Sequence, residues 1–141
     1  QTVDIVFISH TTEAQEVNED DFFKKASSGG TFISSGLSMA EDIINERYSP
    51  SAWNIYTFHC SDGDNWSEDN DKALEKMSYL SDVSQLAGYI QIKPDQSSIW
   101  GEEMAKVFEV LTSNSFKVCR IKEKSDIWPE FAKLFGGKYE L

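Results

Sequence analysis

Strand-like and helix-like segments alternate along this chain, which predicts an α/β fold whose largely parallel sheet carries helices on both faces. Runs of β-branched and aromatic residues typical of buried strands recur at 53–60, 86–92 and 116–121. Between those runs, apolar residues recur at the spacing of one helix face, as around Met77. In sheets of this kind, ligands bind at the carboxyl ends of the strands.

The first third of the chain predicts a hairpin followed by a helix. Residues 3–9 form a strand-like run, and residues 12–17 can pair with it across a short polar turn. A glycine-containing loop then passes through 27–31, and apolar residues recur at helical spacing from Ile33 to about Tyr48.

The rest of the chain continues the strand–helix pattern. Pro50 breaks the preceding helix, and the polar loop 61–66 follows the strand at 53–60. Amphipathic spacing predicts a further helix over 100–111. Asp126 is placed to cap a final helix.

Length and composition fit one domain spanning residues 1–141. The chain is 40% hydrophobic, which supplies a core, and no apolar run approaches the roughly 20 residues of a membrane span. Asp and Glu outnumber Lys and Arg by 24 to 13, giving a net charge of −11. Such a surface repels nucleic acid and anionic lipid, so neither is expected as a partner. With no visible signal peptide and only Cys60 and Cys119, we expect a reduced, cytoplasmic setting with both cysteines in the core.

Candidate functional residues fall in three strand-end loops, at 10–11, 29–31 and 61–65. The last loop is the most acidic, and the carboxylates of Asp62 and Asp64 are donors that Mg²⁺, Mn²⁺ or Ca²⁺ prefer. The acidic residues downstream, Glu68, Asp69 and Asp71, are expected instead to stabilise the N-terminus of the helix they enter. Asp62 fits either role.

Other chemistries find less support in the sequence. The paired Gly29 and Gly30 precede no P-loop lysine and fit a tight turn. His59 and Cys60 are neighbours on a predicted strand, so their side chains point to opposite faces and rarely reach one zinc ion. No Gly-x-Ser-x-Gly elbow or catalytic triad marks a nucleophile.

Four segments of the first half are distinctive: VFISHTTEA at 6–14, SGGT with ISS within 28–35, YSPSAWNIY at 48–56 and FHCSDGDNW at 58–66. Together they resemble the YeaH/YhbH family of uncharacterised bacterial proteins associated with sporulation and stress. The resemblance covers residues 3–70, and the sequence beyond is compatible with it. It implies a cytoplasmic protein of a sporulation or stress pathway.

That family is similar to von Willebrand factor A domains, which have a three-layer, Rossmann-like fold. The similarity implies a metal-ion-dependent adhesion site, in which three loops supply hydroxyl and carboxylate ligands to Mg²⁺ or Mn²⁺. Thr31 matches the threonine of the second loop and Asp62 the aspartate of the third, with Asp64 beside it. The Asp-x-Ser-x-Ser motif of the first loop is absent and is expected upstream of Gln1.

The resemblance also implies that the first, central strand of the sheet is missing, so that the chain, which begins without an initiator methionine, is a fragment. In the A-domain strand order the strands at 3–9 and 53–60 would then each have an open edge. We predict that these two strands pair directly or that another chain fills the gap, for instance in a homo-oligomer. The missing first helix would leave an apolar patch exposed.

Two function classes follow, and a third stays open. The first is a non-catalytic protein-binding module whose ion, held partly by Thr31 and Asp62, bridges to an acidic group of a partner protein. The second is a metal-assisted hydrolase in which Asp62 and Asp64 share an ion and a histidine acts as acid or base. The third is an interaction scaffold without metal. Hydroxyl ligands favour the first, whereas several carboxylates beside a perturbed histidine would favour the second.

Overall fold

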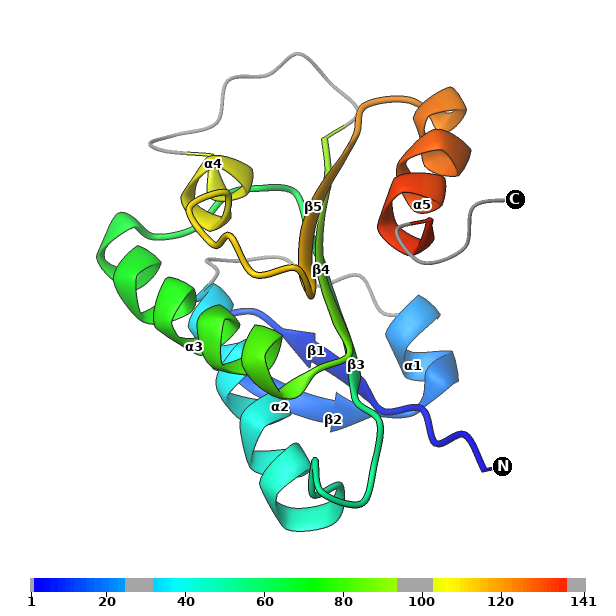
Figure 1. The fold of residues 1–141 in the computed structure, drawn as a ribbon. Helices are drawn as coiled ribbons and strands as arrows, with labels where there is room; N and C mark the ends of the chain where they lie inside the picture. The colour runs from blue at the N-terminus through cyan, green and yellow to red at the C-terminus, as the bar shows by residue number, and fades with distance from the viewer. Residues whose placement is uncertain (1, 25–31, 94–102, 137–141) are drawn as a thin grey trace.

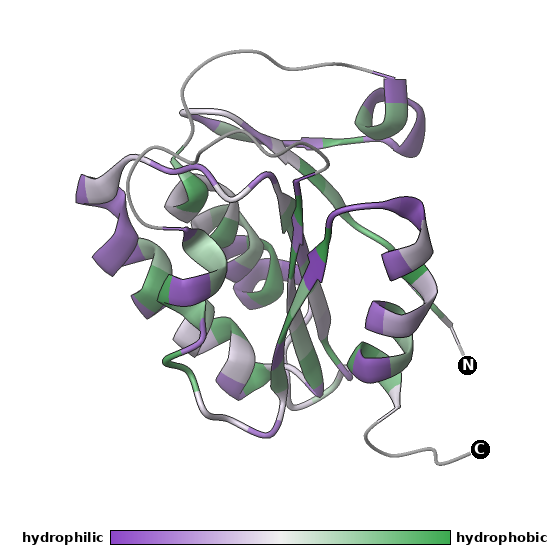
Figure 2. Ribbon diagram, turned by 90° about the horizontal axis from the view of Figure 1, so that it is seen from above, coloured by the Kyte–Doolittle hydropathy of each residue, from purple (hydrophilic) through white to green (hydrophobic). Residues whose placement is uncertain are grey.

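The computed structural model describes residues 2–24, 32–93 and 103–136, and a three-stranded parallel sheet lies at its centre. β3 (Tyr56–Ser61), β4 (Leu86–Ile92) and β5 (Phe116–Ile121) lie in that order, with β4 in the middle. Helices lie on both sides of the sheet (Figures 1 and 2). The predicted mixed α/β architecture with parallel strands is therefore confirmed for the described residues.

A separate antiparallel hairpin precedes this sheet, as predicted. β1 (Phe7–His10) pairs with β2 (Ala14–Val17). The strand expected at 3–9 is therefore shorter than predicted, and it begins four residues later and ends one residue later. The short helix α1 (Glu19–Lys24) follows and was not predicted. It packs on the hairpin through aromatic side chains, and the ring centroids of Phe7 and Phe22 lie 5.1 Å apart.

The larger part of the core lies between the sheet and three helices on one face. These are α2 (Ile33–Arg47), α3 (Asn70–Val83) and α4 (Met104–Phe108), and their apolar sides meet β4 and β5 in one buried cluster. Tyr89 of β4 lies at its centre, with its ring 4.9 Å from that of Phe108. The described part of the helix predicted at 100–111 is short, and residues 94–102 lie outside the described residues.

A smaller cluster lies on the opposite face, under α5 (Ile127–Phe135). Leu134 of this helix packs against Ile90, Cys119 and Ile121. Gly88 of β4 permits this approach, because a Cβ there would lie 2.9 Å from Cδ1 of Leu134. Cys119 is buried as expected.

β3 and β5 are the two edge strands of the parallel sheet, and β3 is the more exposed of them. Among the described residues the backbone of β3 pairs with β4 alone. Of the two alternatives predicted for the strands at 3–9 and 53–60, direct pairing is therefore wrong, and filling of the gap by another chain stays a prediction. Histidine side chains, described below, occupy the contact between β1 and β3 instead. On the other face of β3, Tyr56, Phe58 and Cys60 are exposed. The expectation that Cys60 lies in the core is therefore wrong, because α5 packs mainly on β4 and β5. Phe135 of α5 reaches Phe58 of β3, with ring centroids 5.7 Å apart, but Cys60 stays exposed.

Asp126 closes the turn before the last helix rather than capping that helix. Its Oδ2 accepts the backbone N–H groups of Lys122 and Glu123, at 2.9 and 3.1 Å, around the 3₁₀ turn η2 (Lys124–Asp126). These two donors hold the pKa of Asp126 below its ordinary value. α5 receives no side-chain cap from Asp126, contrary to the prediction.

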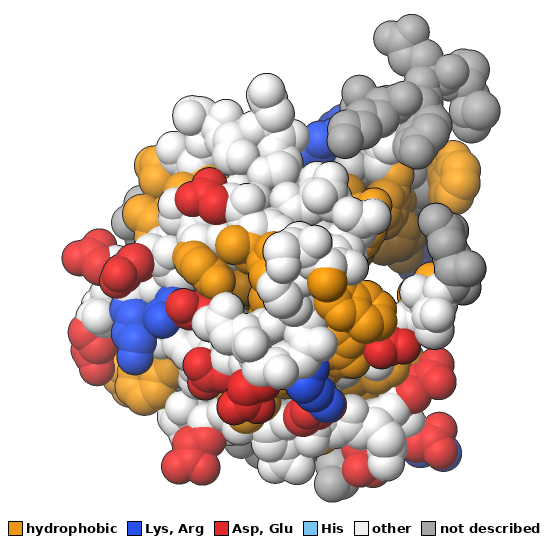
Figure 3. All heavy atoms as spheres, turned by 60° about the horizontal axis from the view of Figure 1, so that its bottom comes forward, with side chains coloured by type: hydrophobic (Ala, Val, Ile, Leu, Met, Phe, Trp, Pro, Cys, Tyr) orange, Lys and Arg blue, Asp and Glu red, His pale blue; other side chains and the backbone are white. Residues whose placement is uncertain are grey.

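The surface reflects the acidic composition. Acidic side chains are spread over the face shown in Figure 3, with apolar side chains between them. Among the residues that the structure describes, no helix is both long enough and apolar enough to span a bilayer.

Candidate functional site at the strand ends

The polar loop after β3 closes over the N-terminus of α2. Asn65, at the end of this loop, accepts a hydrogen bond through Oδ1 from the backbone N–H of Ile33, at 2.9 Å. Ile33 is the first residue of α2, so its N–H has no partner within the helix. The bond brings the loop at 62–65 beside the start of α2. Thr31, two residues before Ile33, lies outside the described residues.

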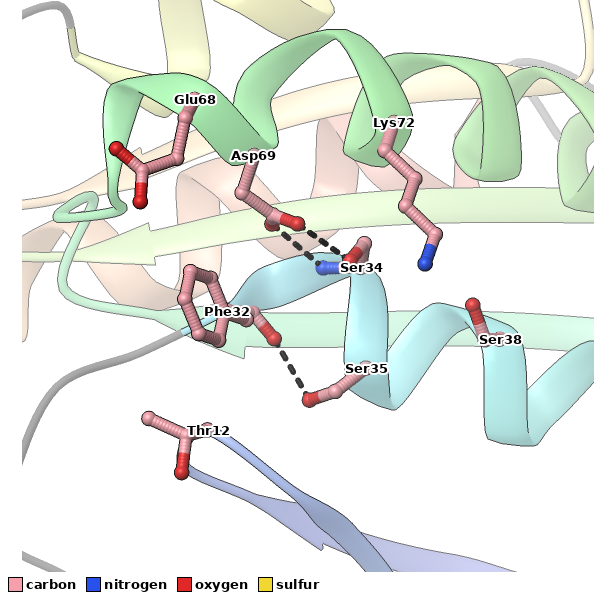
Figure 4. Close-up of a pocket in the computed structure, with 8 residues that line it drawn as sticks. All are labelled: Thr12, Phe32, Ser34, Ser35, Ser38, Glu68, Asp69 and Lys72. Atoms are coloured by element: carbon pink, nitrogen blue, oxygen red, sulfur yellow. Dashed lines mark hydrogen bonds between the residues drawn. The ribbon is translucent and has the colours of Figure 1, made fainter.

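Asp69 completes the cap of α2. Its carboxylate accepts the backbone N–H of Ser34 at 3.0 Å and the Ser34 hydroxyl at 2.5 Å (Figure 4). Asn65 Nδ2 also donates to it, at 3.1 Å. These donors offset the cost of burying a carboxylate that is only 7% exposed. We expected Asp69 to serve the helix that follows it, but its side chain caps a helix 35 residues earlier and makes no cap bond to α3.

Asp62 lies in a fixed turn directly after β3. Its carboxylate is exposed, and Oδ1 accepts the backbone N–H of Asp64 at 3.0 Å. Gly63 has a φ of +92°, and a Cβ there would lie 2.5 Å from Oε1 of Gln91, so only glycine fits. The carbonyl of Gly63 accepts the N–H of Met104 at 3.2 Å. The turn is therefore held between β4 and α4 while the Asp62 carboxylate faces solvent.

Asp62 and Asp64 differ as cation ligands. The exposed Asp62 carboxylate, at a strand end, is the kind of donor that a hard cation such as Mg²⁺ prefers. Asp64 Oδ2 lies 3.9 Å from Lys93 Nζ, and that ammonium group competes with a metal ion for the same oxygen. Within the described ranges, no three His, Cys, Asp or Glu side chains gather closely enough to hold an ion. A site at Asp62 therefore needs hydroxyl groups, water or ligands from further segments.

A polar pocket of about 420 Å³ opens beside the same helix N-terminus (Figure 4). It is formed by the β1–β2 turn, the start of α2, the 3₁₀ turn η1 (Ser67–Asp69) and the start of α3, through Thr12, Phe32, Ser34, Ser35, Ser38, Glu68, Asp69 and Lys72. Glu68 lies toward the left of the view and Lys72 toward the right, with Ser34 and Ser35 between them. A partner group bound at the neighbouring loop would therefore meet hydroxyl groups and both signs of charge.

The contact that sequence reasoning missed joins the chain's two histidines. His10 ends β1 and His59 lies in β3, 49 residues away, and their Nε2 atoms are 2.8 Å apart. The ring of His59 also lies 5.5 Å from that of Tyr89. Gly36 of α2 leaves room for the pair, because a Cβ there would lie 2.7 Å from Cδ2 of His10. Two isolated histidines form no spacing motif, and only the adjacency of the two strand ends could have predicted their contact.

Burial sets the protonation of this pair. Desolvation lowers the pKa of His59 to about 3, with the charge of His10 acting in the same direction, and burial also lowers the pKa of His10. Both rings are therefore neutral at pH 7, and one Nε2–H donates to the other Nε2. Both Nδ1 atoms are buried and have no hydrogen-bond partner among the described residues.

Fold and site together define a mixed α/β protein whose strand-end loops cap a helix and present an exposed carboxylate. Comparison with protein families then identifies the chain more closely. Residues 1–138 match the family described as "Protein of unknown function (DUF444)", and the chain belongs to this family.

Relatives of the chain are longer bacterial proteins. The chain is 51% identical over 132 residues to a UPF0229 protein of Ruminiclostridium cellulolyticum, covering 94% of this chain and 33% of the relative. It is 38% identical over 139 residues to UPF0229 protein ECA2349 of Pectobacterium atrosepticum, covering 96% of this chain and 32% of the relative. The chain thus spans about a third of the length of the curated relatives it matches. No solved structure matches it.

Proposed function

We propose that this chain is part of a non-catalytic protein-binding module whose strand-end loops hold Mg²⁺ or Mn²⁺. Asp62 and Thr31 would supply ligands, with Asp64 beside them, and the others would come from a segment outside this chain. One observation carries the proposal: the bond from Ile33 N–H to Asn65 Oδ1 brings the loop of Asp62 against the helix that Thr31 precedes. An ion shared by two loops needs this proximity.

The chemistry of such a site suits an acidic partner. A hard cation that keeps an open coordination position accepts a carboxylate oxygen from another protein, and no base or nucleophile takes part. With a net charge of −11, the chain repels acidic partners at long range. A bound divalent cation reverses the local sign, so partner binding would depend on the ion.

The hydrolase alternative has less support. It needs several carboxylates and a perturbed histidine in one cluster. The pKa of His59 is strongly lowered, but its hydrogen-bond partner is His10. Asp62 lies beyond the end of β3, in a turn of its own, and faces solvent.

The biological setting extends the proposal. The resemblance to the YeaH/YhbH proteins and to A domains, within a bacterial family of unknown function, supports a cytoplasmic protein of a sporulation or stress pathway. Its partner would be a protein rather than nucleic acid or lipid, because the acidic surface repels both of those. By the A-domain resemblance, the missing loop would follow a further strand beside β3, contributed by a segment outside this chain.

Calorimetric titration of Mg²⁺ and Mn²⁺ into a polypeptide extended upstream tests the proposal. We expect saturable binding that weakens at least about tenfold, or about 1.4 kcal/mol, in Asp62→Ala. Asp71→Ala is the matched control, because Asp71 is also exposed but lies in the first turn of α3. Absence of binding, or binding that Asp62→Ala leaves intact, contradicts the ion site and leaves an interaction scaffold without metal.

A further inference from the structure

We propose that the contact between His10 and His59 is an acid-sensitive latch that holds the β1–β2 hairpin against the parallel sheet. It is closed while both imidazoles are neutral and opens when both are protonated. This inference does not depend on the ion site, because it concerns only the two histidines and the elements packed around them.

The histidine contact is where the hairpin meets the parallel sheet. Besides the packing of α1 on Phe7, the hairpin is bonded to α2 and the residue before it: Thr11 O accepts Phe32 N–H at 2.9 Å, and Arg47 forms an ion pair with Glu16 at 2.8 Å. Across the described residues, no backbone pairing joins β1 to β3, and the His10–His59 bond is the hydrogen bond between them. Loss of this bond would free the β3 side of the hairpin while α2 still holds the other side.

Proton counting gives the latch its two states. In the neutral pair, one Nε2–H donates to the lone pair of the other Nε2. A first added proton goes to the free ring nitrogen of one histidine and can leave this bond in place. A second proton puts N–H groups on both facing Nε2 atoms, so the bond is lost and two positive charges face each other. Among the described residues, neither Nδ1 has a hydrogen-bond acceptor to stabilise an added proton.

The surroundings do not compensate the charge. Burial lowers the pKa of His10 and outweighs the backbone of Thr11 and, from η1, the carboxylate of Asp69, which both act to raise it. The Asp69 carboxylate is already bonded to Ser34 and Asn65. From β4, Tyr89 faces His59, and burial raises the pKa of its hydroxyl, so it stays neutral. From α2, the facing residue is Gly36, which has no side chain. Within the part of the chain that the structure describes, a doubly protonated pair would therefore be buried without a dedicated counter-ion. Opening the contact to water would hydrate both charges and remove this cost.

The converging nitrogens are less suited to a metal ion. Within the described ranges no third His, Cys, Asp or Glu side chain joins them. Histidines that bind a metal almost always donate their other N–H to a carboxylate or carbonyl group, and neither Nδ1 has such a hydrogen-bond partner among the residues described. The two histidines are therefore better suited to bind protons than to bind a metal ion.

The pH window follows from the sign of the shifts. Because burial lowers both pKa values from 6.5, the closed state binds fewer protons than the open one. The closed state is therefore fully favoured above pH 6.5 and is progressively lost as the pH falls below it. The chain contains only these two histidines, and carboxylates titrate near pH 4, so changes between about pH 7.5 and about pH 5 report on the pair.

Imidazole nitrogen NMR and amide hydrogen exchange on the 141-residue chain test the latch over this window. We expect both rings to be neutral at about pH 7.5, the upper end of this window. Toward the lower limit, exchange in residues 7–17 should rise at least about tenfold, after correction for its intrinsic pH dependence, while β4 stays protected. Rings that titrate independently near 6.5 with hairpin exchange unchanged overturn the proposal. So does a parallel rise in β4, which would indicate global unfolding.

Two variants sharpen the test. His59→Gln cannot take up the second proton, and its amide can still bond His10, so hairpin exchange should lose its acid dependence. Glu16→Gln is the matched control, because it weakens the hairpin's contact with α2 and should raise exchange without changing the acid dependence. If His59→Gln does not fold, the pH dependence of imidazole NMR and of hairpin exchange in the unaltered chain still tests the latch.

Discussion

β3 and β4 are adjacent strands of one sheet, yet their surroundings differ. β4 pairs on both edges and buries residues 87–91, whereas β3 pairs on one edge and exposes 59% of Tyr56. Both strands are rich in the residues typical of buried strands. Composition therefore predicts that each is a strand, but the number of neighbours decides how much each contributes to stability. β3 has the side chains of a central strand in the position of an edge strand.

The same substitution in the two strands measures this difference. Tyr89→Ala should cost about 3–5 kcal/mol of unfolding free energy, because Tyr89 is fully buried in the larger cluster. Tyr56→Ala should cost less than about 1 kcal/mol, because most of that side chain is already in water. Urea unfolding of both variants provides the values. Equal costs would mean that β3 is as well packed as β4.

A smaller effect tests how closely β4 is packed on its second face. Gly88→Ala should cost about 1–3 kcal/mol, because its Cβ would lie 2.9 Å from Leu134 and 3.2 Å from Cδ1 of Phe58. Adding Leu134→Ala removes the nearer contact, so the double variant should lose less than the sum of the two single losses. Additive losses would show that Gly88 is needed for another reason.

The third prediction concerns the loop that follows β3. Asp69→Ala should cost about 1–2 kcal/mol, because it leaves the N–H and hydroxyl of Ser34 without their acceptor at the start of α2. Glu68→Ala is the matched control, since Glu68 is exposed on the same turn. Thermal unfolding of both variants gives the comparison, and equal shifts would show that the buried carboxylate contributes nothing specific.

These effects separate what the sequence could predict from what it could not. The strands at 86–92 and 116–121 and the helix beginning at Ile33 follow from local periodicity, and the structure has them at those positions. The cap from Asp69 to Ser34 and the meeting of His10 with His59 join residues far apart in the chain. Local patterns carry no information about such pairs, because a carboxylate before a helix fits its own N-terminus equally well.

The stability loss expected for Tyr56→Ala is the smallest of these effects in the 141-residue chain, but it becomes the most informative one in a longer polypeptide. Relatives are about three times as long, and the proposed function places a further segment beside β3. If that segment covers the strand, Tyr56→Ala should cost about 2 kcal/mol or more in the longer polypeptide, against less than about 1 kcal/mol here. Tyr89→Ala, already fully buried, should cost the same in both, which controls for a general change in stability. An unchanged cost for Tyr56 would mean that β3 stays an edge strand in the whole protein, and the first loop of the proposed ion site would then have to reach Asp62 from elsewhere.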